Sequence, residues 1–236
     1  MQNGAQSFEE GSLILIDKPY KWTSFDVVNK IKWQLVHRLG LKKIKIGHAG
    51  TLDPLATGLL LVCTGKFTKR IEEFQAKEKE YTGTFVLGAT TPCFDLEKEI
   101  DERFPTEHIT DLNILEAAYS FLGEQQQVPP LFSAVKIDGK RAYEYARKNE
   151  KVEIKSKTIT ISEFQITKIE MPEVDFRIVC SKGTYIRSVA RDFGQKLNSG
   201  AYLSALRRTR IGEFRVEDAE EITDLSARIS QDSPSE

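Results

Sequence analysis

Residues 47–58 read GHAGTLDPLATG, and this stretch constrains the fold more than any other part of the chain. Its glycines allow positive φ angles, and Pro54 keeps the preceding Asp53 out of the helical region. The apolar run at 59–63 then anchors the segment. The pattern predicts a rigid loop that presents one carboxylate, Asp53, close to the imidazole of His48. Such a display suits nucleophilic or acid/base chemistry, whereas the alternative is an Asp-Pro turn whose carboxylate bonds its own backbone.

Common cofactor and metal motifs do not match this chain. A phosphate-binding P-loop fails around Gly65-Lys66, because the first glycine position holds Leu60 and the last position holds Phe67. The dinucleotide pattern Gly-x-Gly-x-x-Gly does not occur, and the three histidines and three cysteines show no zinc-ligand spacing. We therefore expect neither a cofactor nor a metal.

The composition favours a cytoplasmic globular protein. The chain has 236 residues, of which 40% are hydrophobic and 29% charged, so it can bury a sizeable core. No apolar run approaches the roughly 20 residues needed to span a bilayer, and the first residues do not resemble a signal peptide. Three cysteines without framework spacing suit buried thiols in a reducing compartment. We expect no membrane association.

The formal net charge of −1 hides two basic stretches, at 18–45 and 182–215. Compensating acidic residues gather at 95–116 and after Val216. If the two basic stretches meet, they form a surface for a polyanion, whereas the alternative is two solvated helix faces.

The order of elements predicts an α+β fold in a single domain, 1–236. Strands are expected at 12–17, 81–88, 157–169 and 174–180. Helices are expected to be capped by Thr23-Ser24, by Thr110 or Asp111, and by Thr184, and the last helix runs to Leu197. Residues 123–150 are rich in Pro, Gly and polar residues and are expected to form a segment inserted into the main fold, called the excursion below. Residues 222–236 are expected to form an acidic, partly disordered tail. Because strands and helices alternate without a regular βαβ rhythm, we expect a mixed, largely antiparallel sheet flanked by helices and loops.

Several motifs in one order resemble the TruB family of tRNA pseudouridine synthases. The Asp53 loop alone is moderately specific, but the ordered set is highly specific. The matching segments are 16–19, 47–58, 79–81, 128–136, 142–147, 180–187 and 206–208. The resemblance implies the pseudouridine synthase fold and isomerisation of uridine at position 55 in the T arm of tRNA. It also implies base flipping, no cofactor, and a monomer without an obligate protein partner.

The resemblance implies that Asp53 is the catalytic carboxylate, attacking either C1′ of the ribose or C6 of the uracil. Tyr81 would stack on the uracil and assist proton removal, and Arg187 would pair with Asp53.

Substrate-binding roles are carried over in the same way. His48 would contact displaced nucleotides, Tyr185 would pack against the base, Leu206 would close the apolar side of the pocket, and Lys18 would contact substrate. The excursion at 123–150 would contact RNA.

The chain departs from the family pattern at three places, one of which is Asn149-Glu150, where many members have glycine. The turn at 90–95 differs from the usual Asp/Thr-rich turn, which leaves Asp95 without an expected role. Many relatives continue into a small C-terminal RNA-binding domain, so this chain is expected to be a short form without it. Two alternatives stay open: an RNA-binding folding factor, and a pseudouridine synthase that acts on ribosomal or messenger RNA.

Overall fold

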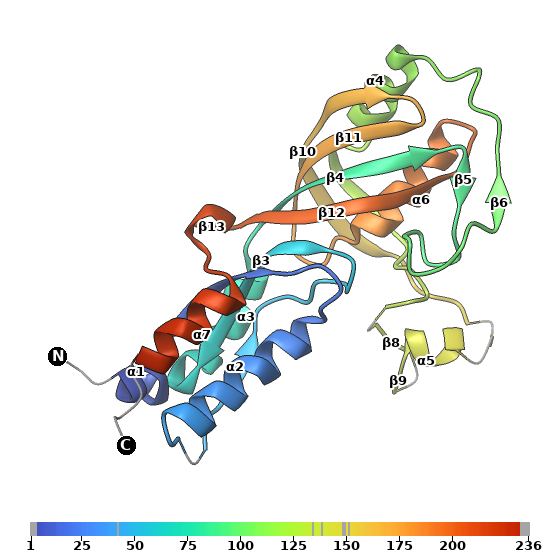
Figure 1. The fold of residues 1–236 in the computed structure, drawn as a ribbon. Helices are drawn as coiled ribbons and strands as arrows, with labels where there is room; N and C mark the ends of the chain where they lie inside the picture. The colour runs from blue at the N-terminus through green and yellow to red at the C-terminus, as the bar shows by residue number, and fades with distance from the viewer. Residues whose placement is uncertain are drawn as a thin grey trace. The chain divides into compact units, whose positions relative to one another are not determined.

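The structure, a computed structural model, forms two compact units, coloured along the chain in Figure 1. It describes residues 4–41, 43–133, 135–137, 139–147, 150 and 152–231. The first unit comprises residues 1–81 and 207–236, and the second comprises 82–206. Both boundaries fall inside strands, β4 (Lys79–Leu87) and β12 (Ala201–Ile211). The sequence prediction of a single domain stays a prediction.

The first unit is built around strand β3. β1 runs antiparallel to β3, from Leu13 opposite Cys63 to Lys18 opposite Gly58, and β2 is also antiparallel to β3. β12 is parallel to β3, with Arg208 opposite Gly58, so the sheet is mixed as predicted. The elements of this unit besides β12 are α1 (Gly4–Glu10), β1 (Leu13–Lys18), α2 (Ser24–Arg38), β2 (Ile46–His48), β3 (Thr57–Thr64), η1 (Gly65–Arg70), α3 (Ile71–Ala76), β13 (Phe214–Arg215), η2 (Val216–Asp218) and α7 (Ile222–Gln231).

Strand β3 is buried on both faces, which explains its unbroken apolar run. On one face, Leu60 and Val62 belong to a core cluster that α2 and α7 complete, and Figure 1 shows these two helices side by side. On the other face, Leu59 and Leu61 pack in a second cluster with Phe74. Because both faces are covered, β3 is a firm base for the loop that precedes it.

The predicted start of α2 is confirmed by a capping box. Thr23 Oγ1 accepts a hydrogen bond from the Asp26 backbone N–H at 3.0 Å, and Asp26 Oδ2 accepts one from the Thr23 N–H at 2.8 Å. These bonds satisfy two backbone donors that a helix start leaves without helical partners.

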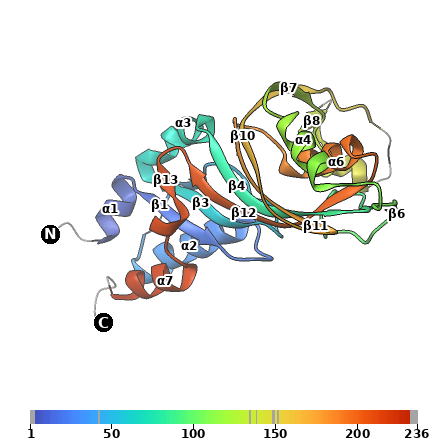
Figure 2. The ribbon, with the colours of Figure 1, turned by 90° about the horizontal axis from the view of Figure 1, so that it is seen from above.

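The second unit is a largely antiparallel sheet in the order β12-β4-β11-β10-β7 with helices packed against it. Figure 2 shows α4 and α6 on one side of these strands. The phenylalanine rings of the core include the stacked pair Phe85 and Phe176, with centroids 4.1 Å apart, and Phe164 and Phe193, 5.7 Å apart. The remaining elements are β5 (Ala89–Thr90), β6 (Glu102–Arg103), α4 (Asp111–Tyr119), β7 (Gly123–Gln127), β8 (Lys136–Ile137), β9 (Lys140–Arg141), α5 (Ala142–Arg147), β10 (Lys157–Glu170), β11 (Glu173–Cys180) and α6 (Ile186–Lys196).

Helix α6 begins differently from the sequence prediction. Thr184 does not cap it; its hydroxyl donates to the Ser181 carbonyl at 3.0 Å instead. Tyr185 is the N-cap residue and supplies no side-chain cap. Its backbone N–H donates to Gln127 Oε1 at 2.8 Å, and Gln127 Nε2 donates to the Tyr185 carbonyl at 3.1 Å. The start of α6 is therefore held by a buried glutamine far away in sequence.

The excursion and the tail both contain regular structure. β7, at the start of the excursion, pairs with β10 from Gln127 opposite Lys157 to Gly123 opposite Ile161. The predicted partly disordered tail contains α7, whose Leu225 and Ile229 are fully buried. Its last residues, 232–236, lie outside the described part of the chain.

Gly83→Ala tests the packing of the second unit. A Cβ there would overlap the Ala205 carbonyl oxygen and lie 2.8 Å from Cζ of Phe176. We expect the free energy of unfolding to fall by about 3 kcal/mol, because a close-packed strand cannot yield cheaply. Gly123→Ala is the control: its φ of +92° is strained but no atom lies within 4 Å, so about 1 kcal/mol is expected. Equal losses in denaturant melts would contradict this packing.

Candidate active site

The loop that joins β2 to β3 presents Asp53. Gly50 and Gly58 adopt φ angles of +95° and +99°, as the sequence predicted, whereas Gly47 lies in β2 without a positive φ. The Ala56 N–H donates to the Asp53 carbonyl at 3.1 Å, which closes a tight turn around Pro54. Asp53 is half-buried on this loop.

Arg208 ties the two ends of this loop together. Its buried guanidinium donates from Nη2 to the Gly50 carbonyl at 3.0 Å and from Nε to the Leu59 carbonyl at 2.8 Å. A Cβ on Gly58 would overlap the Arg208 backbone, so only glycine allows β12 to approach here. The sequence suggested no role for Arg208 beyond its place in a basic stretch. The feature that could have pointed to a role is that Arg208 belongs to the matching segment 206–208.

Lys18 supports the loop from the other side. Its fully buried ammonium donates to the carbonyls of Trp22 at 2.6 Å, Pro19 at 3.0 Å and Pro54 at 3.3 Å. Burial lowers the pKa of Lys18 from 10.5 to about 8; the charge of Asp53 opposes this shift and that of Arg208 adds to it. The Lys18 ammonium thus binds three backbone carbonyls and lies near enough to Asp53 for their charges to interact. Contact of Lys18 with substrate stays a prediction.

His48 stands at the end of β2, next to the loop. Burial lowers its pKa, the positive charge of Arg208 lowers it further, and the Gly50 backbone opposes the shift. Its Nδ1 is buried and has no hydrogen-bond partner among the described residues. The ring is therefore neutral near pH 7, which suits contact with a nucleobase better than with a phosphate. In the first unit, the charge of Arg208 thus acts on both Lys18 and His48, and that of Asp53 acts on Lys18.

The second unit holds Arg187 in a buried polar site. Arg187, the second residue of α6, lies with Nε 3.6 Å from Asp95 Oδ2. It also donates to the carbonyls of Cys93 at 3.2 Å and Phe132 at 3.0 Å. Asp95, for which the sequence suggested no role, is itself buried, and its Oδ1 accepts from the Glu97 N–H at 3.0 Å. The predicted pairing of Arg187 with Asp53 joins residues of different units and stays a prediction.

The other predicted site residues lie on rigid elements. Tyr185 is half-buried, and the ammonium of Lys157 lies 4.1 Å from its ring centroid, a cation–π contact. Burial lowers the pKa of Lys157. Tyr81 is buried in β4, and Leu206 is half-buried in β12. Their roles toward substrate stay predictions. Gln127, which fixes the Tyr185 backbone, was not identified from sequence because it is one of three consecutive glutamines in a polar run.

In the structure, most arginines of the basic stretch 182–215 are paired with carboxylates or buried, and the joint surface of the two basic stretches stays a prediction. In 182–215, carboxylates pair with Arg187, Arg191, Arg207 and Arg210, and Arg208 is buried. These arginines hold the structure together.

Exposed lysines gather at a pocket of about 360 Å³, here called the lysine pocket, whose lining includes Lys43, Lys45, Lys66 and Lys69 together with Glu9. Two of these lysines, Lys43 and Lys45, belong to the basic stretch 18–45. The lysine pocket lies at the Thr64 end of β3, and the strand rise puts Thr64 about 23 Å from Thr57, next to the Asp53 loop. Lys42 lies outside the described residues.

The described residues contain no group of three or more His, Cys, Asp or Glu side chains that could hold a metal ion. Among the helices of the described residues, none is long and apolar enough to cross a membrane.

Comparisons with known proteins define the class. A model of the TruB family pseudouridylate synthase N-terminal domain matches residues 37–186. Pseudouridine synthases are isomerases, and this chain is one of them. It belongs to the TruB family.

Similar proteins and solved structures support this assignment. The chain is 62% identical over 219 residues to tRNA pseudouridine synthase B of Flavobacterium johnsoniae, covering 92% of this chain and 96% of that protein. It is 60% identical over 212 residues to the protein of the same name from Phocaeicola vulgatus, covering 90% of each. A chain in the crystal structure of a Cbf5-Nop10-Gar1 complex matches with a TM-score of 0.70 and 30% identity. That match covers 94% of this chain and 55% of the other, so this chain spans about half its length. The predicted α+β fold is confirmed.

Lys18 gives the site a measurable pH signature. Below about pH 8 it is protonated in both folded and unfolded chains; between about 8 and 10.5 only the unfolded chain keeps the proton. The unfolding free energy should therefore rise with pH across this window, by up to about 3 kcal/mol relative to Lys18→Met. Chemical denaturation at stepped pH measures it. Parallel pH profiles for the two proteins would contradict a depressed Lys18 pKa.

Proposed function

We propose that this protein converts uridine to pseudouridine at position 55 in the T arm of tRNA, using Asp53 and no cofactor. The observation that carries the proposal is the Asp53 loop, pinned by the buried cations Arg208 and Lys18. Such pre-organisation keeps a nucleophile in place before substrate arrives. The names of the similar proteins support tRNA as the substrate.

The reaction breaks the bond from C1′ of the ribose to N1 of the uracil and forms a bond from C1′ to C5. The proton on C5 is lost and N1 gains one, so the reaction is an isomerisation. Asp53 attacks either C1′ or C6, and both routes need a carboxylate in its ionised form. The charge of Asp53 in turn raises the pKa of Lys18, against the larger effect of burial, so the two groups lie close enough to interact.

The base must leave the folded RNA before it can react. Base flipping costs a few kcal/mol, and stacking on aromatic rings recovers part of that cost. In our proposal Tyr81 and Tyr185 stack on the uracil, Leu206 closes the apolar side, and His48 contacts displaced nucleotides. Arg187, held by Asp95, pairs with Asp53. The excursion at 123–150 contacts the RNA. The protein acts in the cytoplasm as a monomer, without a protein partner.

Asp53→Asn tests the chemistry. It should lower turnover on a T-arm stem-loop by more than a thousandfold while RNA affinity stays within a few-fold, because the carboxylate supplies chemistry and little binding. Site-resolved pseudouridine mapping measures the product, and a stem-loop with cytidine at position 55 is the control. Modification of full-length tRNA at another site by the wild-type protein would contradict the T-arm assignment. Binding without any product would favour the RNA-folding alternative.

The lysine pocket should supply backbone contacts to the RNA. Changing Lys43, Lys45, Lys66 and Lys69 to Gln should weaken tRNA binding, and each lost phosphate contact should reduce the log–log salt slope by about 0.7–0.9. Lys98→Gln with Lys168→Gln is the control, since these exposed lysines lie in the second unit. Equal salt slopes for the pocket variant and wild type would show that the lysine pocket is not part of the RNA-binding surface.

A further inference from the structure

The outer face of α2 carries exposed aromatic side chains that the fold does not need. The inner face of the helix is buried through residues such as Val27, Ile31 and Leu35. On the outer face, Phe25 is 65% exposed and Trp33 is 49% exposed. Large apolar groups left in water on a helix with a complete core face mark an interaction surface.

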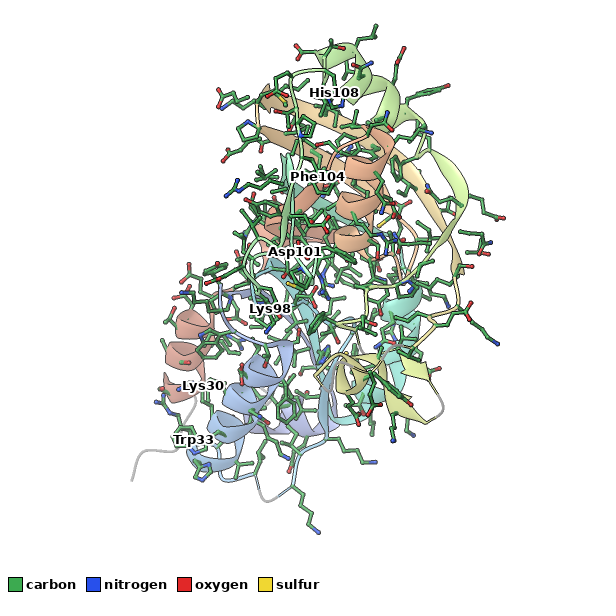
Figure 3. All side chains as sticks on the ribbon, turned by 90° about the vertical axis from the view of Figure 1, so that its right-hand side faces the viewer. Lys30, Trp33, Lys98, Asp101, Phe104 and His108 are labelled. Carbon is green, nitrogen blue, oxygen red and sulfur yellow. The ribbon has the colours of Figure 1, made fainter. Side chains whose placement is uncertain are left out.

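This outer face is also positively charged. Lys30 and Lys32 are exposed, and the Lys30 ammonium lies 5.8 Å from the ring centroid of Trp33. Figure 3 labels Lys30 and Trp33 on α2. His37 stacks on Trp33, with centroids 4.7 Å apart and planes at 20°. The acidic residue of this face, Asp26, is engaged in the capping box.

The N-terminus of α2 is joined to the catalytic loop. Ser24 Oγ accepts from the Leu52 N–H at 2.9 Å and donates to the Leu52 carbonyl at 3.2 Å. The Lys21 N–H donates to the Pro54 carbonyl at 2.9 Å. These bonds attach the helix start to the residues on both sides of Asp53. Phe25 is next to Ser24 in the chain, and the helix rise puts Trp33 about 12 Å further along the helix axis.

We propose that this face of α2 is an RNA track: unpaired bases of the substrate RNA stack on Phe25 and on the Trp33–His37 pair, and phosphates bind Lys30 and Lys32. The proposal rests on the proposed function for its RNA substrate. Alternating aromatic and basic groups suit a strand whose π-faces and phosphates alternate. Sequence-specific recognition of RNA uses mainly bases freed from stacking, and the track starts at the loop where one such base would react.

Tryptophan fluorescence tests the stacking directly. The chain has two tryptophans, so Trp22→Phe leaves Trp33 as the sole reporter and Trp33→Phe leaves Trp22. Both are made in the Asp53→Asn protein, which prevents turnover, and titrated with tRNA and with a T-arm stem-loop. We expect Trp33 emission to be quenched in parallel with binding, and to a greater extent than Trp22 emission.

Affinity measurements give a second readout. Trp33→Ala and Phe25→Ala should each weaken RNA binding by about 5- to 150-fold, the range that corresponds to 1–3 kcal/mol for one base–aromatic stack. Tyr119→Ala is the matched control, because this 76% exposed aromatic lies on α4 in the second unit. It should leave affinity unchanged. Circular dichroism melts check that each variant folds.

The outcomes separate this proposal from the proposed function. Unchanged Trp33 emission at saturating RNA, with wild-type affinity of Trp33→Ala, would overturn the track even if the wild-type protein forms pseudouridine. Parallel quenching without any pseudouridine from wild type would support the track and count against the proposed reaction. Self-association that Trp33→Ala abolishes, together with unchanged RNA affinity, would overturn the track in favour of a protein contact.

Discussion

The buried guanidinium of Arg208 is the interaction on which the candidate active site depends. One side chain bonds the Gly50 carbonyl before Asp53 and the Leu59 carbonyl after it, so the two ends of the loop cannot separate. Burying a guanidinium costs free energy unless its N–H groups are hydrogen-bonded, and here the acceptors are backbone carbonyls at the two ends of the loop. Loop geometry and burial of the cation therefore stabilise each other, and Gly58 provides the space for this approach.

The same principle recurs in the second unit, where buried polar groups hold the start of α6. Gln127 binds both backbone groups of Tyr185, and Arg187 is held by Asp95 and by two carbonyls. Side chains with a proposed role toward RNA thus rest on strands and helix starts, with long-range hydrogen bonds behind them. Rigid support of this kind lowers the entropy that must be lost when substrate binds.

Local sequence patterns predicted the features that depend on residues close together in the chain, such as helix starts and buried strands. Thr23 caps α2 because its partner Asp26 lies three residues away, and the run 59–63 is the buried strand β3. Thr184 does not cap α6, because its hydroxyl donates to the Ser181 carbonyl and the Tyr185 backbone N–H donates to Gln127. The partners Asp95 and Arg187 are distant in sequence, and so are Arg208 and Gly50. Neither pairing has a periodic signal. The glycine-rich loop pattern identified Asp53, whereas only the motif resemblance identified Arg187.

The central claim is that Arg208 positions Asp53 for chemistry by closing its loop. The most direct measurement compares Arg208→Lys with wild type by hydrogen exchange at residues 49–56, and by the single-turnover rate on a T-arm stem-loop. A lysine keeps the charge but cannot bridge two carbonyls in a planar fork. The account predicts loss of protection across the loop and a rate lowered about a hundredfold or more, with RNA affinity within a few-fold. Wild-type protection together with a wild-type rate would contradict it.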